Sequence, residues 1–177
     1  AYVERVVQDA DSAGVDALVF DIDTFGGRVD AATVIRDAIL DADLLTIAFI
    51  NNRAISAGAL ISLACDKIVM VKGGTIGAST PVSGGGEKAS DKYVSVMRAE
   101  MRGTAERTDR DAEIAEAMVD ERIYIPEFSD EVGQPATLTT EQALQYGIAD
   151  ETAESLHALL EIYDLADAQI VDLQQRV

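Results

Sequence analysis

The sequence predicts an α/β fold with a mostly parallel sheet built from repeated strand-helix units, and two observations carry this prediction. The first is that three short apolar runs, residues 15–20, 44–50 and 67–71, have the length of strands buried on both faces. The second is that segments with apolar side chains at helical spacing separate these runs. Right-handed crossovers would then place the three strands parallel in one sheet.

The elements of the N-terminal half follow from spacing and turn residues. Residues 1–13 carry valines at helical spacing, and Gly14 ends that helix. We expect a helix over 29–40 after the first strand and a helix of small residues over 57–65 after the second. A tight glycine-rich turn over 73–79 should follow the third strand.

The C-terminal half has shorter elements. Ser90 is placed to cap a long helix, residues 112–119 continue as another helix, and 122–125 are expected to form a short strand. Residues 140–150 predict a capped helix, a glycine C-cap and a short strand. A last helix is expected over 152–164.

Composition limits the function classes. With 177 residues, 48% of them hydrophobic and only 5% aromatic, residues 1–177 are expected to form a single domain with a core of Ala, Val, Ile and Leu. The 32 acidic and 14 basic side chains give a formal charge of −18, which argues against nucleic acid or an anionic membrane as partner. The chain begins at Ala1 and has no apolar run that could span a bilayer, and we interpret it as a piece of a longer protein.

Ser56 is the residue around which the candidate chemistry is organised. It stands between the second predicted strand and the helix of small residues, where backbone N–H groups have no partner inside the helix. A hydroxyl in that place suits an acyl-transfer nucleophile. Serine is also favoured as a helix N-cap because of the same N–H groups, so a purely structural cap is the alternative interpretation.

The base for such a serine is expected to be a lysine. His157 is the only histidine and lies on a late amphipathic segment, so we expect it on the surface and not in a Ser-His-Asp triad. Cys65 is the only cysteine, which leaves a zinc site without its usual ligands, and we expect no cofactor. Lysine is the known substitute for histidine. Lys92 would fall in the first turn of the helix capped by Ser90, where the helix dipole disfavours the ammonium form.

Gly26 and Gly27 follow the first predicted strand. A backbone without side chains can approach a substrate closely, and the N–H groups of Gly27 and Ala57 could form a two-donor oxyanion hole. A simple strand-to-helix turn would use the same two glycines.

The assembled motifs are Asp23-Thr24-Phe25-Gly26-Gly27-Arg28, Ala54-Ile55-Ser56-Ala57-Gly58, Gly73-Gly74-Thr75-Ile76-Gly77-Ala78, Lys92, and Ala143-Leu144-Gln145-Tyr146-Gly147-Ile148-Ala149-Asp150. In this order and spacing they resemble the ClpP-class serine proteases. Within that class they are most similar to the NfeD-type membrane-bound proteases found beside stomatin-like proteins.

This resemblance implies a ClpP/crotonase-like fold and a Ser-Lys dyad of Ser56 and Lys92. It implies that the oxyanion hole comes from Gly27 and Ala57.

By the same resemblance, Gly26 and Phe25 would contact the substrate, with Phe25 standing where the family usually has proline. The implied activity is ATP-independent cleavage of hydrophobic peptide segments, with a stomatin-like membrane protein as partner. The family also implies a homo-oligomer and membrane anchorage through parts absent from this chain, with this domain outside the cytoplasm.

Three alternatives stay open at this point. Asp21 and Asp23 after an apolar strand approach the pattern of a Mg²⁺-dependent phosphotransferase, without its later acidic motif. A crotonase-type acyl-CoA enzyme would share the fold, but it needs a basic rim for the phosphates of CoA. The third alternative is a catalytically weak oligomeric scaffold that binds a stomatin-like membrane partner.

Overall fold

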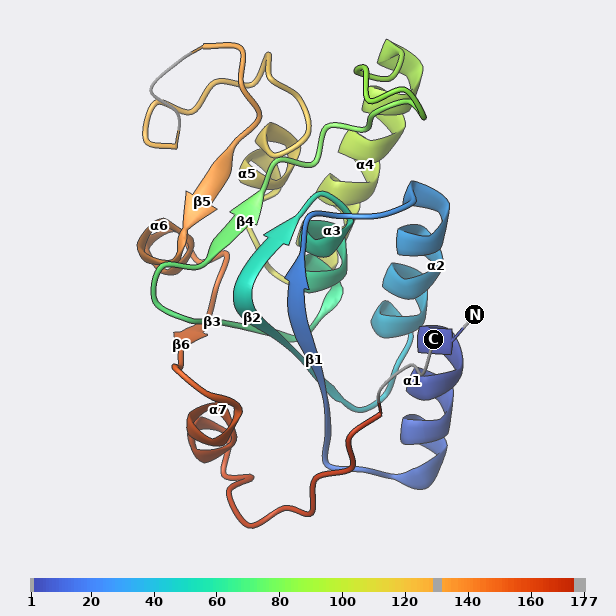
Figure 1. Ribbon diagram of the computed structural model, residues 1–177, viewed down its shortest axis with the longest axis vertical. Helices are drawn as coiled ribbons and strands as arrows, with labels where there is room; N and C mark the ends of the chain where they lie inside the picture. The colour runs from blue at the N-terminus through green and yellow to red at the C-terminus, as the bar shows by residue number, and fades with distance from the viewer. Residues whose placement is uncertain (1, 129–131, 174–177) are drawn as a thin grey trace.

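The computed structural model describes residues 2–128 and 132–173, and within these ranges the chain forms an α/β fold around a six-stranded sheet (Figure 1). The elements in chain order are α1 (Tyr2–Ala13), β1 (Ala17–Thr24), α2 (Val29–Leu40), β2 (Leu45–Ile55), α3 (Ala57–Ala64), β3 (Lys67–Met70), β4 (Thr75–Gly77), α4 (Asp91–Arg107), α5 (Ala112–Ala117), β5 (Thr137–Thr139), α6 (Thr140–Gln145), β6 (Glu151–Thr152) and α7 (Leu156–Ile162).

β2 is the central strand of the sheet. β1 pairs with it in parallel along one edge, while β3 pairs with the first half of its other edge and β4 with the second half. β6 continues the sheet in parallel from β3, and only β5 runs antiparallel, beside β4. The predicted parallel sheet of strand-helix units is therefore confirmed. It places the carboxyl ends of β1 and β2 side by side, which is where open α/β sheets bind ligands.

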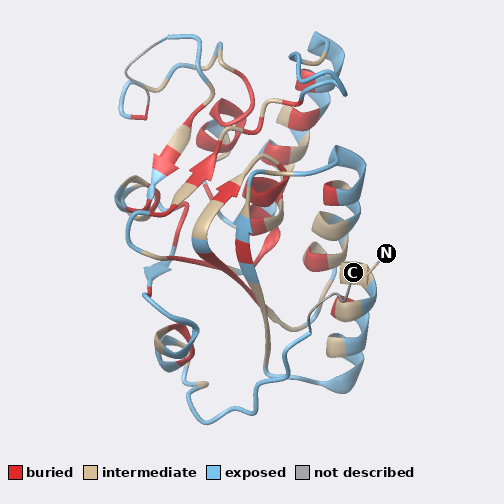
Figure 2. Ribbon diagram, in the orientation of Figure 1, coloured by how far each residue is buried: buried red, intermediate tan, exposed pale blue. Residues whose placement is uncertain are grey.

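The apolar run of β2 packs on both faces of the sheet. Ala48 and Ile50 belong to a large core cluster beneath α2, α3 and α4, whereas Ile47 and Phe49 belong to a smaller cluster with Leu159 of α7. Figure 2 shows this burial concentrated in the central strands and α3. Because successive side chains of a strand point to opposite faces, a run buried on both sides must be apolar throughout.

The core is made of small aliphatic side chains and methionine. Beyond the expected Ala, Val, Ile and Leu, all four methionines of the chain are buried, Met70, Met101 and Met118 completely. Unbranched methionine adapts to irregular gaps, which a core with few aromatic rings leaves behind.

Arg110 fixes the C-terminal end of α3. The side chain is buried, and its guanidinium donates hydrogen bonds to the carbonyls of Leu63, Cys65 and Asp66 and to that of Ile148. It also pairs with a carboxylate oxygen of Asp150 at 3.1 Å. Cations are favoured at this end of a helix dipole, so α3 is held firmly at the end opposite to Ser56.

Two sequence predictions for short elements were wrong. Residues 73–79, expected as a turn, contain β4, because Gly77 lets β5 come close: a Cβ on Gly77 would lie 2.3 Å from the carbonyl oxygen of Ala136. Residues 122–125 form the end of a turn, a bend and irregular chain, and not a strand. The carboxylate of Asp120 binds both the backbone N–H and the guanidinium of Arg122, and this local closure favours a turn.

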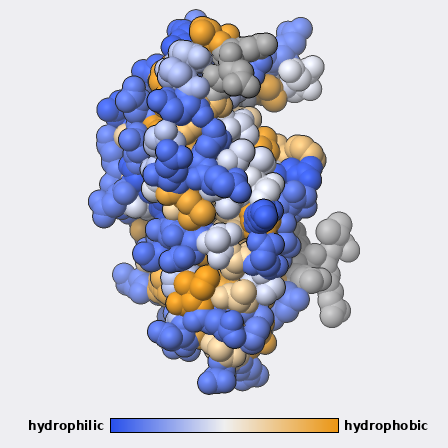
Figure 3. Space-filling model, turned by 90° about the vertical axis from the view of Figure 1, so that its left-hand side faces the viewer, coloured by the Kyte–Doolittle hydropathy of each residue, from blue (hydrophilic) through white to orange (hydrophobic). Residues whose placement is uncertain are grey.

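The surface reflects the acidic composition. On the face shown in Figure 3, hydrophilic side chains predominate and hydrophobic ones form separate small patches. No described helix combines the length and apolar character needed to cross a bilayer.

Candidate functional site

Ser56 occupies the single-residue turn between β2 and α3 in a strained backbone conformation. Its φ is 56° and its ψ is −116°, a combination that a non-glycine residue adopts only when the surroundings impose it. The side chain makes no capping hydrogen bond to α3 although Ser56 stands at the N-cap position. The capping interpretation is therefore not supported, since a cap needs an extended backbone to turn its oxygen back onto the helix.

The neighbours that impose this conformation belong to β4 and to the segment after it. The backbone N–H of Ser56 donates to the carbonyl of Gly77 at 3.0 Å. The hydroxyl of Ser79, which is buried, lies 3.3 Å from the carbonyl oxygens of both Ser56 and Gly77. Sequence analysis did not identify Ser79, because only the pairing of β4 with β2 brings it here.

The turn after β1 lies directly against Ser56. A Cβ on Gly26 would be 2.8 Å from Cβ of Ser56 and 3.2 Å from its Oγ, so only glycine fits. Gly58 is restricted in the same way, because a Cβ there would lie 2.6 Å from the methyl group of Thr24. Two glycines thus allow β1 and α3 to pack tightly on either side of the serine.

Two backbone donors beside Ser56 are open. The N–H of Gly26 is occupied by the hydroxyl of Thr24 at 3.0 Å. The N–H groups of Gly27 and Ala57, in contrast, have no acceptor within the described ranges. Unpaired N–H groups at the start of a helix and in a glycine turn are the donors that an oxyanion or a carbonyl oxygen can use.

Phe25 is exposed on the same turn and is covered on one side by an arginine. The guanidinium carbon of Arg53 lies 4.4 Å from the centroid of the Phe25 ring. Arg53 also forms an ion pair of 3.2 Å with Asp23, whose other oxygen accepts a hydrogen bond of 3.4 Å from the side chain of Asn52. This group of Asp23, Phe25, Asn52 and Arg53 was not predicted as a unit.

Lys92 lies in the first turn of α4, and its side chain is exposed. No hydrogen bond or ion pair joins it to Ser56 or to any other side chain in the described part of the molecule. Lys88, four residues earlier, lies outside the helix and pairs with Glu121 at 2.5 Å. Residues 82–88 form a small hairpin, closed by a bridge between Val82 and Lys88.

An ion-pair network anchors α4 further along. Arg98 and Arg102 both pair with Glu116, and Arg98 also binds the buried carboxylate of Asp120 at 2.8 Å. Hydrogen bonds from Arg122, and after them those from Arg98, hold the pKa of Asp120 well below its usual range although burial opposes this shift. The network fixes the middle of the helix that carries Lys92.

The other candidate groups lie away from this chemistry. His157 is exposed, with Nε2 3.4 Å from a carboxylate oxygen of Glu161. Burial raises the pKa of the Cys65 thiol well above its usual range, so this sulfur stays protonated. The described residues hold no group of three acidic, histidine or cysteine side chains that could bind a metal ion, and Asp23 is engaged with Arg53.

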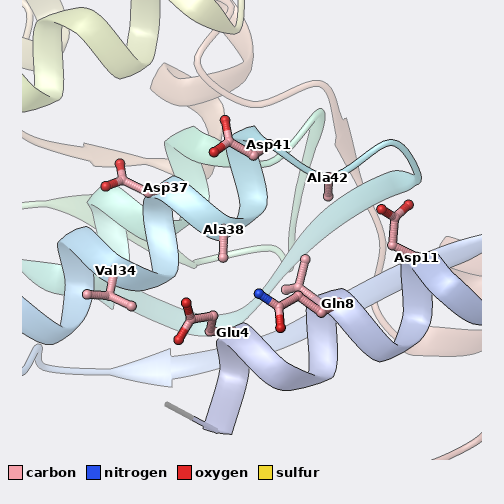
Figure 4. A pocket seen from close by; sticks show the side chains of 9 residues that line it. Glu4, Gln8, Asp11, Val34, Asp37, Ala38, Asp41 and Ala42 are labelled. Atoms are coloured by element: carbon pink, nitrogen blue, oxygen red, sulfur yellow. The ribbon is translucent and has the colours of Figure 1, made fainter.

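A groove of about 440 Å³ lies between α1 and α2 (Figure 4). Val7, Val34 and Ala38 supply apolar surface, and carboxylates line its sides. Its lining contains no serine, threonine, cysteine or lysine and none of the residues around Ser56, so it is not the candidate active site.

Comparison with known sequences assigns the chain to one protein family. Residues 1–173 match the family model described as NfeD1b, N-terminal domain. The chain is 36% identical over 170 residues to the membrane protein NfeD1b of Bacillus subtilis, which covers 96% of this chain and 39% of that protein. It is 28% identical over 165 residues to the membrane-bound protease PH1510 of Pyrococcus horikoshii, covering 89% of this chain and 34% of that protein. The chain thus spans well under half the length of these relatives.

Solved structures of a related protease have the same fold as this chain. The 1510-N membrane-bound stomatin-specific protease, as a lysine-to-alanine mutant in complex with a substrate peptide, matches with a TM-score of 0.75 and 28% identity over 90% of this chain and 71% of that chain. Its serine-to-alanine mutant gives the same TM-score and identity. ClpP1 from Listeria monocytogenes matches with a TM-score of 0.64 at 22% identity, over 89% of this chain and 85% of that chain, which shows a shared fold. The predicted ClpP-like fold and the NfeD-type resemblance are confirmed.

Proposed function

Because the chain belongs to the NfeD1b N-terminal domain family, we propose that it is an ATP-independent serine endopeptidase in which Ser56 is the nucleophile and Lys92 the base. The observation that carries the proposal is the strained, uncapped Ser56 beside the two open N–H groups of Gly27 and Ala57. A relative 28% identical to this chain is named a membrane-bound protease, and a serine and a lysine were the residues replaced in its mutants.

In the proposed reaction, neutral Lys92 takes the proton of the Ser56 hydroxyl while Oγ bonds to the carbonyl carbon of the peptide. The carbonyl oxygen becomes negative and is held by the N–H groups of Gly27 and Ala57, each worth roughly 3 kcal/mol in such a site. Collapse breaks the C–N bond, and the lysine ammonium returns its proton to the leaving amine. Water then attacks the acyl-serine in the same way, releasing the acid and regenerating Ser56.

The proposed substrate is a hydrophobic peptide segment of a stomatin-like membrane protein, contacted by Gly26 and by the exposed ring of Phe25. The relative 1510-N is named stomatin-specific, and one of its solved structures is a complex with a substrate peptide, which supports this choice. We further propose that residues 1–177 are one protease domain of a longer membrane-anchored protein that acts as a homo-oligomer.

A second candidate function is a catalytically weak scaffold for the same membrane partner. The exposed position of Lys92, with no bond to Ser56 in the described structure, favours it. The peptidase proposal therefore includes a step in which bound peptide or a neighbouring subunit orders residues 82–92 and brings the amine to the serine. Slower hydrogen exchange over these residues on adding an inhibitor would support that step, and unchanged exchange would contradict it.

Labelling with a serine-directed fluorophosphonate tests the mechanism. The wild-type chain should be modified at Ser56, as located by peptide mass spectrometry, and Ser56→Ala should not react. Lys92→Ala should slow labelling by about a thousandfold, which is the usual contribution of a general base. Lys88→Met is the matched control, because it removes a lysine of the same segment that is paired with Glu121, and it should label at the wild-type rate.

The outcomes separate the two functions. Labelling of Lys92→Ala at the wild-type rate would defeat the dyad while keeping Ser56 as nucleophile. Absence of labelling in the wild type between pH 6 and 10, both with and without an added hydrophobic peptide, would reject the peptidase and favour the scaffold.

A further inference from the structure

The aromatic ring of Phe25 is held by an arginine that belongs to the strand carrying Ser56. Arg53 lies three residues before Ser56 on β2, with its guanidinium carbon 4.4 Å from the ring centroid. A guanidinium within about 6 Å of a ring centroid attracts the ring electrostatically. The ion pair with Asp23, on β1, fixes the same guanidinium from a second side.

A bulge in β2 explains how Arg53 reaches across. Ile22 of β1 pairs with Ile50, and Thr24 pairs with Ala54. Between these two pairs β1 has one residue, Asp23, and β2 has three, residues 51–53. The extra residues of β2 face Asp23, and both Asn52 and Arg53 direct their side chains to its carboxylate. Bulges commonly re-aim a side chain beside an active site.

The turn held by Arg53 has few other restraints. Phe25 is 75% exposed, and the described partner of Arg28 is Asp30, itself exposed. A Cβ placed on Gly27 would meet no atom within 4 Å. Within the described residues, the tip of this turn is held by the bond between Thr24 and Gly26, by the packing of Gly26 against Ser56 and by the contact of Phe25 with Arg53.

Small displacements of this turn reach Ser56 directly. Gly26 approaches the serine so closely that a Cβ on it would lie 2.8 Å from Cβ of Ser56, and the open N–H of Gly27 follows it in the chain. Donors of an oxyanion hole act only when they lie at hydrogen-bond distance from the developing charge, and a misplacement of 1 Å can cost about a hundredfold in rate.

We infer that Arg53 is a positioning residue, which holds the Phe25 turn through the ring stack and the Asp23 ion pair and thereby sets the Gly27 donor against Ser56. The inference deepens the proposed function and rests on it. The described partners of the Arg53 side chain are Asp23 and Phe25, and Ser56 is not among them. Arg53 acts on the Gly27 N–H indirectly, by holding the turn in place.

The rate of fluorophosphonate labelling tests this role, because the probe uses Ser56 and the oxyanion donors without a peptide. Arg53→Met should lower the rate about tenfold, since both restraints are lost while the length of the side chain is kept. Arg53→Lys keeps the charge for Asp23 but lacks the planar group, so it should lower the rate by about threefold. Arg28→Met is the matched control and should stay within about twofold of wild type, because it removes an equal charge that does not face Phe25.

A second readout follows the turn without any reaction. In Arg53→Met the backbone ¹⁵N heteronuclear NOE of Gly26 and Gly27 should fall, and the melting temperature should stay within about 2 °C, because the pair is partly exposed. In Phe25→Leu, the further change Arg53→Met should have much less effect on labelling than it has in the wild type, because both act through one contact.

Equal labelling of wild type and Arg53→Met, or unchanged NOE values, would overturn the inference while the proposed function stands. A wild type that does not label would instead reject the proposed function, and the NOE values would still decide whether Arg53 holds the turn.

Discussion

The turn that carries Ser56 and the helix end that carries Lys92 are built in opposite ways. Ser56 is held in a strained conformation by its backbone hydrogen bond to Gly77 of β4, by the hydroxyl of Ser79 and by the close approach of Gly26. Lys92 is exposed in the first turn of α4, behind a glycine-rich hairpin. The difference teaches that the pairing of the strands fixes the serine itself, whereas the position of the amine depends on a lightly restrained segment.

Adding a single methyl group to each region tests this contrast. Gly58→Ala should lower the free energy of unfolding by about 2 to 3 kcal/mol, because its Cβ would lie 2.6 Å from the methyl of Thr24 in the tightly packed region. Gly84→Ala, in the hairpin before Lys92, meets no atom within 4 Å and should change it by less than about 0.5 kcal/mol. Urea unfolding measures both variants, and equal effects would contradict the contrast.

A second change tests whether the ion-pair network, and not the hairpin, anchors α4. Asp120→Asn should lower the free energy of unfolding at pH 7 by about 2 kcal/mol, because the buried carboxylate accepts charged hydrogen bonds from Arg98 and Arg122. Asp30→Asn is the matched control. The hydrogen bond from Arg28 lowers the pKa of Asp30 to about 2, but this pair is exposed, and no measurable loss is expected.

The contribution of Asp120 to the free energy of unfolding changes with pH in a defined direction. Its folded-state pKa lies below that of an unfolded aspartate, so the native carboxylate adds stability that is complete above about pH 5 and is lost as the pH falls towards the folded-state pKa. The gap between wild type and Asp120→Asn should therefore shrink between pH 7 and pH 3. A gap that widens on acidification would be inconsistent with the lowered pKa.

The smallest expected effect compares two serines at helix N-cap positions. Ser56 has a φ of 56°, and Ser56→Gly should raise the free energy of unfolding by about 1 kcal/mol because glycine adopts this φ without strain. Ser90 at the start of α4 has an ordinary φ of −62°, and Ser90→Gly should lower it by a few tenths of a kcal/mol. A loss of stability in Ser56→Gly would show that the strain argument is wrong.

Much of the fold could be predicted because burial on two faces leaves a simple pattern. The apolar runs of β1, β2 and β3 and the helical spacing of α2 identify the parallel sheet directly. β4 and β5 were missed because each has three residues, and their pairing depends on Gly77 and not on any apolar run. The last five residues of β2 were also missed, since Asn51, Asn52 and Arg53 look like a loop in the sequence.

The site was less accessible to prediction. Ser56, Gly26 and Gly27 directly follow predicted strands, and that position can be recognised in the sequence. The backbone angles of Ser56, the hydroxyl of Ser79 and the stack of Arg53 on Phe25 arise only when distant strands pair. A polar Asn-Asn-Arg segment immediately after a buried strand is the one local sign that could have pointed to the bulge.

The bulge in β2 also constrains how this strand can change in length. It adds two residues, an even number, so the alternation resumes in phase and Ala54 returns to the same core cluster as Ala48 and Ile50. Deleting one residue there would turn every later side chain to the wrong side and rotate the serine away from its donors. Homologous chains should therefore lengthen or shorten this segment in steps of two, and an odd change would have to be compensated before position 56.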